Sequence, residues 1–322
     1  MHKVFLAGLL ASTILNSHAL GASMSVCNDG VEVTVKCVNP TTTDSHIPQT
    51  DRLSVAMYNR QGSRLGAKLL LWMNGTQPKP ETRHGPVIGP KVGFLKFAIE
   101  SGYRVISVPF HNENSVLKVC KNNPDRACSE NLRYERLYDG PDSIVYQATR
   151  LVQYLANSDP SMGWSIYLTA TGLDWSKITV VGQSQGAGMA AYIAKQNLVA
   201  GAILFSAPAD FTKTQHGKEL APWLNWNSKT PPDRWFAAYH TQESGAVMLN
   251  KAYHLLRVPE DHIVGFTNNV ANGKPHGNGM SDVAHVDDWR RFLGTSTTTT
   301  SASAKTMPAM PDANVDQDND EQ

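Results

Sequence analysis

The 322-residue sequence lacks an excess of charge of either sign. Its 29 lysine and arginine residues are balanced by 28 aspartate and glutamate residues, which leaves a net charge of +1. Such a balance gives no support for a nucleic-acid partner. The sequence also lacks an apolar run long enough to cross a bilayer, because the run at residues 4–15 is too short and no other run reaches its length. We therefore expect neither nucleic-acid binding nor a membrane span.

Cysteine is scarce, with four residues in the chain. Cys27 and Cys37 bracket an Asn-Asp-Gly turn signal, and Cys120 and Cys128 bracket a polar loop. Two local disulfides are the simplest pairing of these residues. Neither pair has the spacing of a zinc site or histidines in register, so we expect no metal ion.

The two ends of the chain differ in composition from the middle. Residues 1–22 have the pattern of a secretory signal peptide, with Lys3, an apolar stretch and then small residues. We therefore expect a secreted or periplasmic protein. Residues 295–322 are rich in threonine and serine and end in an acidic run, and such a segment cannot bury enough apolar surface to offset its ordering entropy. We expect a disordered tail there and one domain over residues 23–294.

Strand-like and helix-like segments alternate between these ends. Short apolar runs bounded by turn residues predict strands at residues 31–38, 52–58, 68–73, 103–110, 177–181, 200–205, 234–240 and 262–266. Helices are predicted at residues 92–101, 141–157, 185–196, 245–256 and 287–293. This alternation indicates an α/β fold with a mostly parallel central sheet and helices on both faces. Ligands of such sheets bind beyond the carboxyl ends of the strands.

Residues 182–186 read GQSQG and match the G-x-S-x-G nucleophile elbow. The motif follows an apolar β-branched run and precedes a helix-compatible run, which is the context that the elbow requires. Small residues two before and two after Ser184 would relieve the collisions of so tight a turn. The alternative is a glycine-containing turn with a solvated serine. With this motif the chain resembles the α/β-hydrolase superfamily, and the resemblance implies that Ser184 is a catalytic nucleophile.

The resemblance also implies an oxyanion hole. In this superfamily one backbone N–H comes from the residue after the nucleophile, here Gln185. The other comes from the loop that follows the strand at residues 68–73. Thr76 is our candidate in that loop, with Gln77 as second choice.

The chain order that the superfamily implies is serine, acid, histidine. Glu243 follows the strand at residues 234–240 and is the candidate acid, while Asp210, one strand earlier, is the alternative acid. A surface glutamate that caps the next helix is the alternative role for Glu243. His276, in a glycine-rich loop, is the candidate base. His285, at the start of the last helix, is the alternative base, and it could instead pack or cap.

The similarity narrows to a subgroup of exported bacterial α/β-hydrolase-like proteins and covers residues 65–294. It rests on residues 108–112 (VPFHN), the loop between Cys120 and Cys128, and residues 133–135 (RYE), 163–164 (GW), 175–178 (WSKI), 182–188 (GQSQGAG), 276–277 (HG) and 289–290 (WR). The chain departs from the subgroup at Gln183, where histidine is common, at Met189, and at Glu243, where the acid is an aspartate. These departures remove no catalytic group but leave the substrate open.

The resulting hypothesis is a secreted carboxylic-ester hydrolase that forms an acyl-enzyme on Ser184 and needs no cofactor. Its substrate would be a small-molecule or polymeric ester. An exported peptidase or amidase and a catalytically silent binding scaffold are the alternatives. Residues 208–232 contain Trp223 and Trp226 and are interpreted either as a flap over the site or as a loop fixed to the core. Arg52, Arg60 and Arg64 are interpreted as a solvated basic face.

Overall fold

The computed structural model describes residue 27 and residues 33–59, 67–77, 85–86, 92–270 and 273–295. The predicted signal peptide at residues 1–22 lies outside these ranges, as does the predicted tail apart from Thr295. In the ranges that are described, no helix is both long enough and apolar enough to span a membrane.

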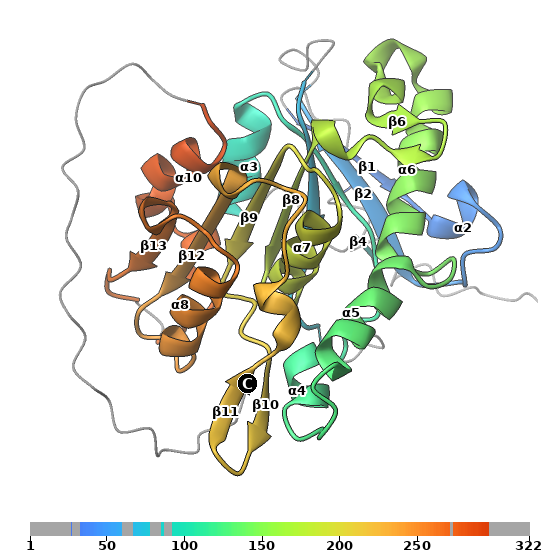
Figure 1. The fold of residues 1–322 in the computed structure, drawn as a ribbon. Coiled ribbons are helices and arrows are strands. Elements are labelled where there is room, and N and C mark those ends of the chain that lie inside the picture. The colour runs from blue at the N-terminus through green and yellow to red at the C-terminus, as the bar shows by residue number, and fades with distance from the viewer. Residues whose placement is uncertain are drawn as a thin grey trace, which may run out of the picture.

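Nine strands of the described chain form one sheet (Figure 1). Eight of them follow the order β1-β2-β5-β3-β8-β9-β12-β13, and β4 (Gly85–Pro86) pairs with β2. Their bounds are β1 Thr34–Val38, β2 Arg52–Tyr58, β3 Leu69–Met73, β5 Arg104–Ser107, β8 Ile178–Gln183, β9 Gly201–Phe205, β12 Trp235–His240 and β13 Ile263–Phe266. The pairs from β5 to β13 are all parallel, and β2 is antiparallel to both β1 and β5.

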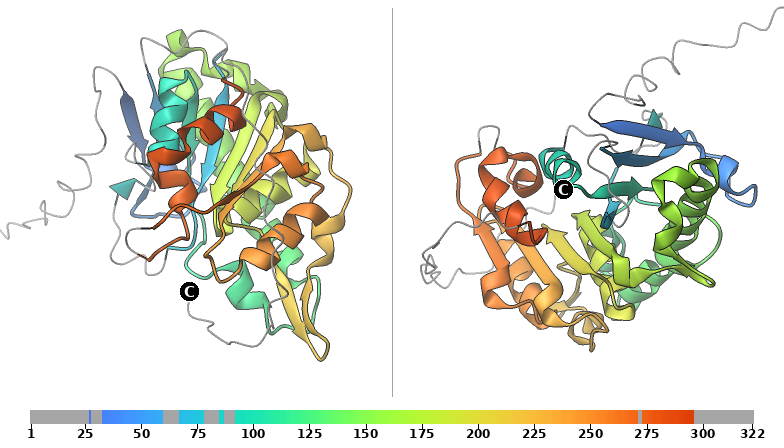
Figure 2. Two further views of the ribbon diagram at one scale, coloured as in Figure 1. Left: turned by 90° about the vertical axis from the view of Figure 1, so that its left-hand side faces the viewer. Right: turned by 90° about the horizontal axis from the view of Figure 1, so that it is seen from above.

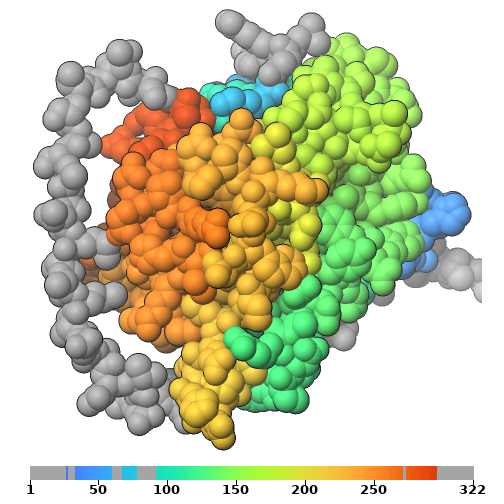
Figure 3. Space-filling model, in the orientation of Figure 1, coloured from blue at the N-terminus to red at the C-terminus, as the bar shows by residue number. Residues whose placement is uncertain are grey.

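Successive residues of the central strands point to opposite faces, and both faces are buried. Leu69, Leu71 and Met73 of β3 belong to one hydrophobic cluster, whereas Leu70 and Trp72 belong to the other. The first cluster is covered by α6 (Ile144–Ser158), α7 (Gln185–Gln196) and α8 (Ala246–Leu255), and the second by α3 (Gly93–Glu100) and α10 (Val286–Phe292). The ribbon views show these layers (Figure 2), and in the space-filling view the segments coloured green to orange form the surface on this side of the molecule (Figure 3). The predicted α/β fold with helices on both faces is confirmed.

The elements that the pattern did not predict lie between the main ones. They include α2 (Pro40–Thr43), α4 (Val116–Cys120), α5 (Cys128–Tyr138), α9 (Asn278–Ser281) and the hairpins β6–β7 (Leu168–Thr169, Gly172–Leu173) and β10–β11 (Phe211–Thr214, Gly217–Leu220). The buried face of α5 consists of Ser129, Arg133 and Leu137, which recur every fourth residue. Because two of these three side chains are polar, hydrophobic periodicity could not reveal the helix.

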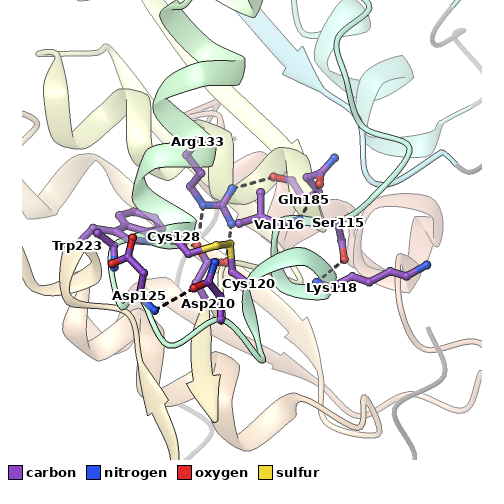
Figure 4. The surroundings of a disulfide bond; sticks show 12 residues. Ser115, Val116, Lys118, Cys120, Asp125, Cys128, Arg133, Gln185, Asp210 and Trp223 are labelled. Carbon is purple, nitrogen blue, oxygen red and sulfur yellow. Dashed lines mark hydrogen bonds and ion pairs between the residues drawn. A yellow bond between two sulfur atoms is a disulfide. The ribbon is translucent and has the colours of Figure 1, made fainter. Parts of the chain in front are cut away.

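Both local cysteine pairs are disulfide-bonded. Cys27 is bonded to Cys37 at the edge strand β1, and Cys120 is bonded to Cys128. The second bond joins the end of α4 to the start of α5 (Figure 4). It lies next to Arg133 and Asp210, which are far apart in the sequence. The disulfide therefore holds together two helices that border the region around Gln185.

Candidate active site

Ser184 occupies a strained turn between β8 and α7. Its φ is 53° and its ψ is −128°, a backbone conformation that residues other than glycine rarely adopt. The turn is held from both sides, because the Ser184 N–H donates to the Phe205 carbonyl at 2.8 Å and the Ser184 carbonyl accepts from Ala187 at 2.9 Å. The side chain is partly exposed at the carboxyl end of β8. This is the geometry of a nucleophile elbow.

The glycines around Ser184 are required by close backbone contacts. A Cβ on Gly182 would lie 2.2 Å from the carbonyl carbon of Gly186, and a Cβ on Gly186 would lie 2.0 Å from the Met73 carbonyl oxygen. Neither contact involves a flexible side chain that could move away. The first turn of α7 therefore packs directly on the end of β3, as the motif predicts.

We expect Gly186→Ala to destabilise the fold by about 3 kcal/mol or more, because the methyl group would push α7 away from β3. Urea unfolding followed by circular dichroism measures this change. Gly245→Ala is the matched control, since a Cβ there meets nothing within 4 Å. We expect the control to change stability by less than about 1 kcal/mol. Equal stability of the two variants would contradict the elbow packing.

Glu243 and His276 are hydrogen-bonded to each other in the structure. The Nδ1 atom of His276 lies 2.7 Å from Oε2 of Glu243. An ionised carboxylate can only accept hydrogen bonds, so Nδ1 carries the proton and Nε2 of a neutral ring is left as an acceptor. Gly277, the next residue, lies against the elbow, since a Cβ there would be 3.8 Å from Nε2 of Gln183. The histidine loop thus reaches the residue that precedes Ser184.

The Glu243 carboxylate is buried and held by further donors. Its Oε1 accepts from the hydroxyl of Ser206 at 2.7 Å and from the backbone N–H of His240 at 2.8 Å. Burial would raise the pKa of Glu243, but the hydrogen bonds from His276, His240 and Ser206 and the His276 charge outweigh it and hold the pKa below its usual value. Glu243 therefore stays ionised at neutral pH. Ser206 directly follows Phe205, whose carbonyl anchors Ser184, so one chain segment connects the acid to the elbow.

The alternative base, His285, is used for packing. Its ring stacks on Phe266 with centroids 3.6 Å apart, and its Nε2 lies 2.8 Å from Oδ1 of Asn278. Burial lowers the pKa of His285, with nearby charges contributing less. The ring is thus held neutral between the sheet and α9, and the structure does not bring it to Glu243.

The alternative acid, Asp210, is paired with an arginine. Arg133 donates to both of its oxygens, at 2.7 Å from Nε and 2.6 Å from Nη2, and the indole N–H of Trp223 donates at 3.0 Å (Figure 4). All three side chains are buried. Trp223 also packs on Tyr192, with ring centroids 5.5 Å apart, which favours the interpretation of its loop as fixed to the core over that of a flap. Asp210 therefore has a structural role here.

The loop after β3 and the start of α7 supply the two candidate oxyanion donors. Gln185 is the first residue of α7, so its N–H belongs to the helix-initial groups that have no intrahelical partner. The second-choice donor, Gln77, is already used, because its N–H donates to the Asn112 carbonyl at 3.0 Å. No such bond engages the N–H of Thr76 in the described structure. The geometry thus favours Thr76 over Gln77.

Asn112 contacts the candidate oxyanion loop and was not among the site residues that the sequence predicted. Its amide donates to the Gly75 carbonyl at 2.7 Å, so side chain and backbone together hold the loop on both sides of Thr76. Arg52 in turn donates to Oδ1 of Asn112 at 2.8 Å and is buried. The prediction of a solvated basic face is therefore wrong for Arg52, and Arg60 and Arg64 lie outside the described residues. The available signal was the polar run at residues 111–114 (HNEN), which begins four residues after the end of the buried strand β5.

A cavity of about 500 Å³ lies at the amino ends of the parallel strands, opposite to the end that carries the elbow. Its walls include residues that precede or begin strands, such as Lys68, Tyr103 and Arg234, together with Phe292 after β13. None of the candidate catalytic residues lines it. Because ligands of parallel sheets bind at the carboxyl ends of the strands, the elbow and not this cavity is the candidate site. Within the described ranges, no three metal-ligating side chains come together as a metal site would require.

Neither a protein-family model nor a curated protein matches the sequence. Similar solved structures include an acylaminoacyl peptidase from Pyrococcus horikoshii, with 12% identity over 82% of this chain and 41% of that chain and a TM-score of 0.46. Oligopeptidase B from Leishmania major matches with 10% identity, over 82% of this chain and 37% of its own, with a TM-score of 0.40. The chain thus spans about two fifths of the length of these peptidases.

A third similar structure is esterase B from Lactobacillus rhamnosis, inhibited by a tributyrin phosphonate, with 11% identity over 85% of this chain and 88% of that chain and a TM-score of 0.46. Similarities at this level carry no argument about activity. The evidence for the fold is the structure of this chain, which has a mostly parallel sheet and a strained serine turn between β8 and α7. The protein has the α/β-hydrolase fold.

Proposed function

We propose that this protein is a serine hydrolase of carboxylic esters that forms an acyl-enzyme on Ser184. The observation that carries the proposal is the strained Ser184 elbow, with the hydrogen-bonded pair of His276 and Glu243 in the neighbouring loops. We also propose that it is secreted or periplasmic. Its two disulfides support this assignment, because such bonds persist in oxidising compartments.

The proposed reaction has two steps. His276 Nε2 removes the proton of the Ser184 hydroxyl as Oγ attacks the ester carbonyl, and the N–H groups of Thr76 and Gln185 stabilise the oxyanion. The imidazolium, stabilised by Glu243, then gives its proton to the departing alkoxide. The alcohol is released, and the acyl group stays bound to Ser184 as the acyl-enzyme. Water attacks this intermediate in the same way and releases the acid and Ser184.

The test compares p-nitrophenyl esters of short acids with the matching p-nitroanilides. We expect the purified mature protein to hydrolyse the esters and to hydrolyse the anilides at least about 100 times more slowly. A preference for anilides would instead identify a peptidase or amidase, and two of the similar structures are named as peptidases. Folded protein that hydrolyses neither and does not react with a fluorophosphonate would identify a non-catalytic scaffold.

We expect Asn112→Ala to lower kcat by about 10- to 100-fold with little change in KM, because the oxyanion loop would lose the side-chain hydrogen bond that holds the Gly75 carbonyl, next to Thr76. Asn112→Asp tests the same contact differently, since a carboxylate cannot donate to the Gly75 carbonyl. Steady-state kinetics on one ester give both constants. A change confined to KM would show that Asn112 does not position the oxyanion hole.

A further inference from the structure

Arg136 lies beside the proposed oxyanion hole. It is on α5, one turn after Arg133, and its Nη1 donates to the side-chain oxygen of Gln185 at 2.7 Å and to the Asn114 carbonyl at 3.1 Å. Gln185 is itself buried, and the same side-chain oxygen accepts from the N–H of Val116 at 2.9 Å. The guanidinium thus directly contacts the side chain of the residue that follows Ser184.

The charge of Arg136 has no ionic partner within the described structure. The carboxylates around it are engaged elsewhere: Asp210 is bound by Arg133, and Glu113 lies 3.3 Å from Nη2 of Arg52. Glu135, its neighbour on α5, is exposed and acts through solvent. Burial, and then the charge of Arg133, lowers the pKa of Arg136, while Glu135 and Glu113 act in the opposite direction. Arginine nevertheless keeps its charge at any physiological pH.

The remaining donors of Arg136 are available to a ligand. Its Nη1 donates the two hydrogen bonds given above. Its Nε and Nη2 have no hydrogen-bond partner among the described residues, and neither atom is fully buried. Both atoms therefore keep some exposure to solvent on a side chain that is partly buried. A guanidinium with one edge fixed and the other edge open is well suited to bind a carboxylate through two parallel hydrogen bonds.

We propose that Arg136 binds an anionic group of the substrate and that the natural substrates are esters carrying a carboxylate near the scissile bond. This inference rests on the proposed function, because it concerns the same site. It makes Arg136 a specificity residue: its contribution to acidic esters exceeds the effect that its hydrogen bond to Gln185 has on every ester. An Arg136 that only braced Gln185 would affect both classes of ester equally.

The experiment uses two matched pairs of esters. In one pair the charge is on the acyl group, with p-nitrophenyl hemiglutarate against p-nitrophenyl valerate. In the other it is on the leaving group, with 4-carboxyphenyl acetate against 4-carbamoylphenyl acetate. We expect the wild type to favour the acidic member of at least one pair by about 10- to 100-fold in kcat/KM, mainly through KM. The preference should shrink as salt is raised.

Arg136→Gln should abolish this preference, which is the ratio of the two kcat/KM values, and should slow the acidic esters far more than the neutral ones. Arg150→Gln is the control for a lost positive charge, since Arg150 pairs with Asp44 and contacts no residue of the site. Arg136→Lys keeps the charge without the fork and should retain part of the preference. No preference in either pair, or an unchanged preference in Arg136→Gln, would overturn the inference.

A binding measurement separates this inference from the proposed function. Glutarate, the product of the acidic acyl ester, should raise the melting temperature of the wild type and of Arg150→Gln but not of Arg136→Gln. That result supports the anion site even where no ester is hydrolysed. Ester hydrolysis with no glutarate effect and no acidic preference would leave the proposed function standing and would disprove the role of Arg136.

Discussion

Replacement of Ser184 by alanine is expected to lower ester hydrolysis by at least about 10⁴-fold and to abolish reaction with a fluorophosphonate. The probe reacts when Oγ attacks phosphorus and fluoride departs, so labelling reports an activated serine independently of the ester chosen. The elbow strain supports this expectation, because a strained backbone persists only where the surrounding structure holds it. The variant should fold normally, since alanine removes one partly exposed hydroxyl.

Ser176→Ala is the matched control for labelling. Ser176 is an exposed serine just before β8, at the opposite end of that strand from Ser184, and its hydroxyl donates to Asp174 at 2.6 Å. We expect it to react with the probe at the wild-type rate. Labelling that persists in Ser184→Ala would show that another nucleophile reacts. Folded wild-type protein that is not labelled would favour the non-catalytic scaffold.

His276→Ala is the second change with a large expected effect, a loss of at least about 10⁴-fold in kcat with circular dichroism unchanged. The ring is bound to Glu243 and is partly exposed, so its removal takes away the base without disturbing the core. Initial rates on a p-nitrophenyl ester, measured well below the melting temperature, give the loss directly.

His285→Ala should give the opposite pair of results. The buried ring stacks on Phe266, so its loss is expected to lower the melting temperature while kcat stays within about threefold of wild type. His276→Ala is therefore expected to lower the rate and not the stability, and His285→Ala to lower the stability and not the rate. An inactive His285→Ala together with a fully active His276→Ala would reverse our assignment of the base.

Much of the fold could be predicted because its signals are local. The eight main strands of the sheet lie within a few residues of their predicted positions, since each is a short apolar run bounded by turn residues. α5 could not be predicted, because Arg133 takes a core position that a pattern analysis reserves for apolar side chains. The side chain is accommodated there only because Asp210, from a distant loop, neutralises it.

Some residues of the candidate site likewise have a local sequence signal, and others do not. Ser184 and its glycines are contiguous, so the sequence by itself determined the elbow and the strand and helix that flank it. Glu243 and His276 could be nominated with alternatives, but spacing along the chain does not state which acid meets which histidine. The contacts that Asn112, Arg52 and Arg136 make around the site had no local signal of comparable strength.

The sequence by itself thus determined the elements, the elbow and the α/β class, because these depend on neighbouring residues and on hydrophobic periodicity. Only the tertiary structure decided which acid meets which histidine. It pairs Glu243 with His276, binds Asp210 to Arg133 and stacks His285 on Phe266, and it places Asn112 against the loop around Thr76. The reason is that parallel strands gather their following loops at one edge. The contacts made there depend on the order of strands in the sheet and not on distance along the chain.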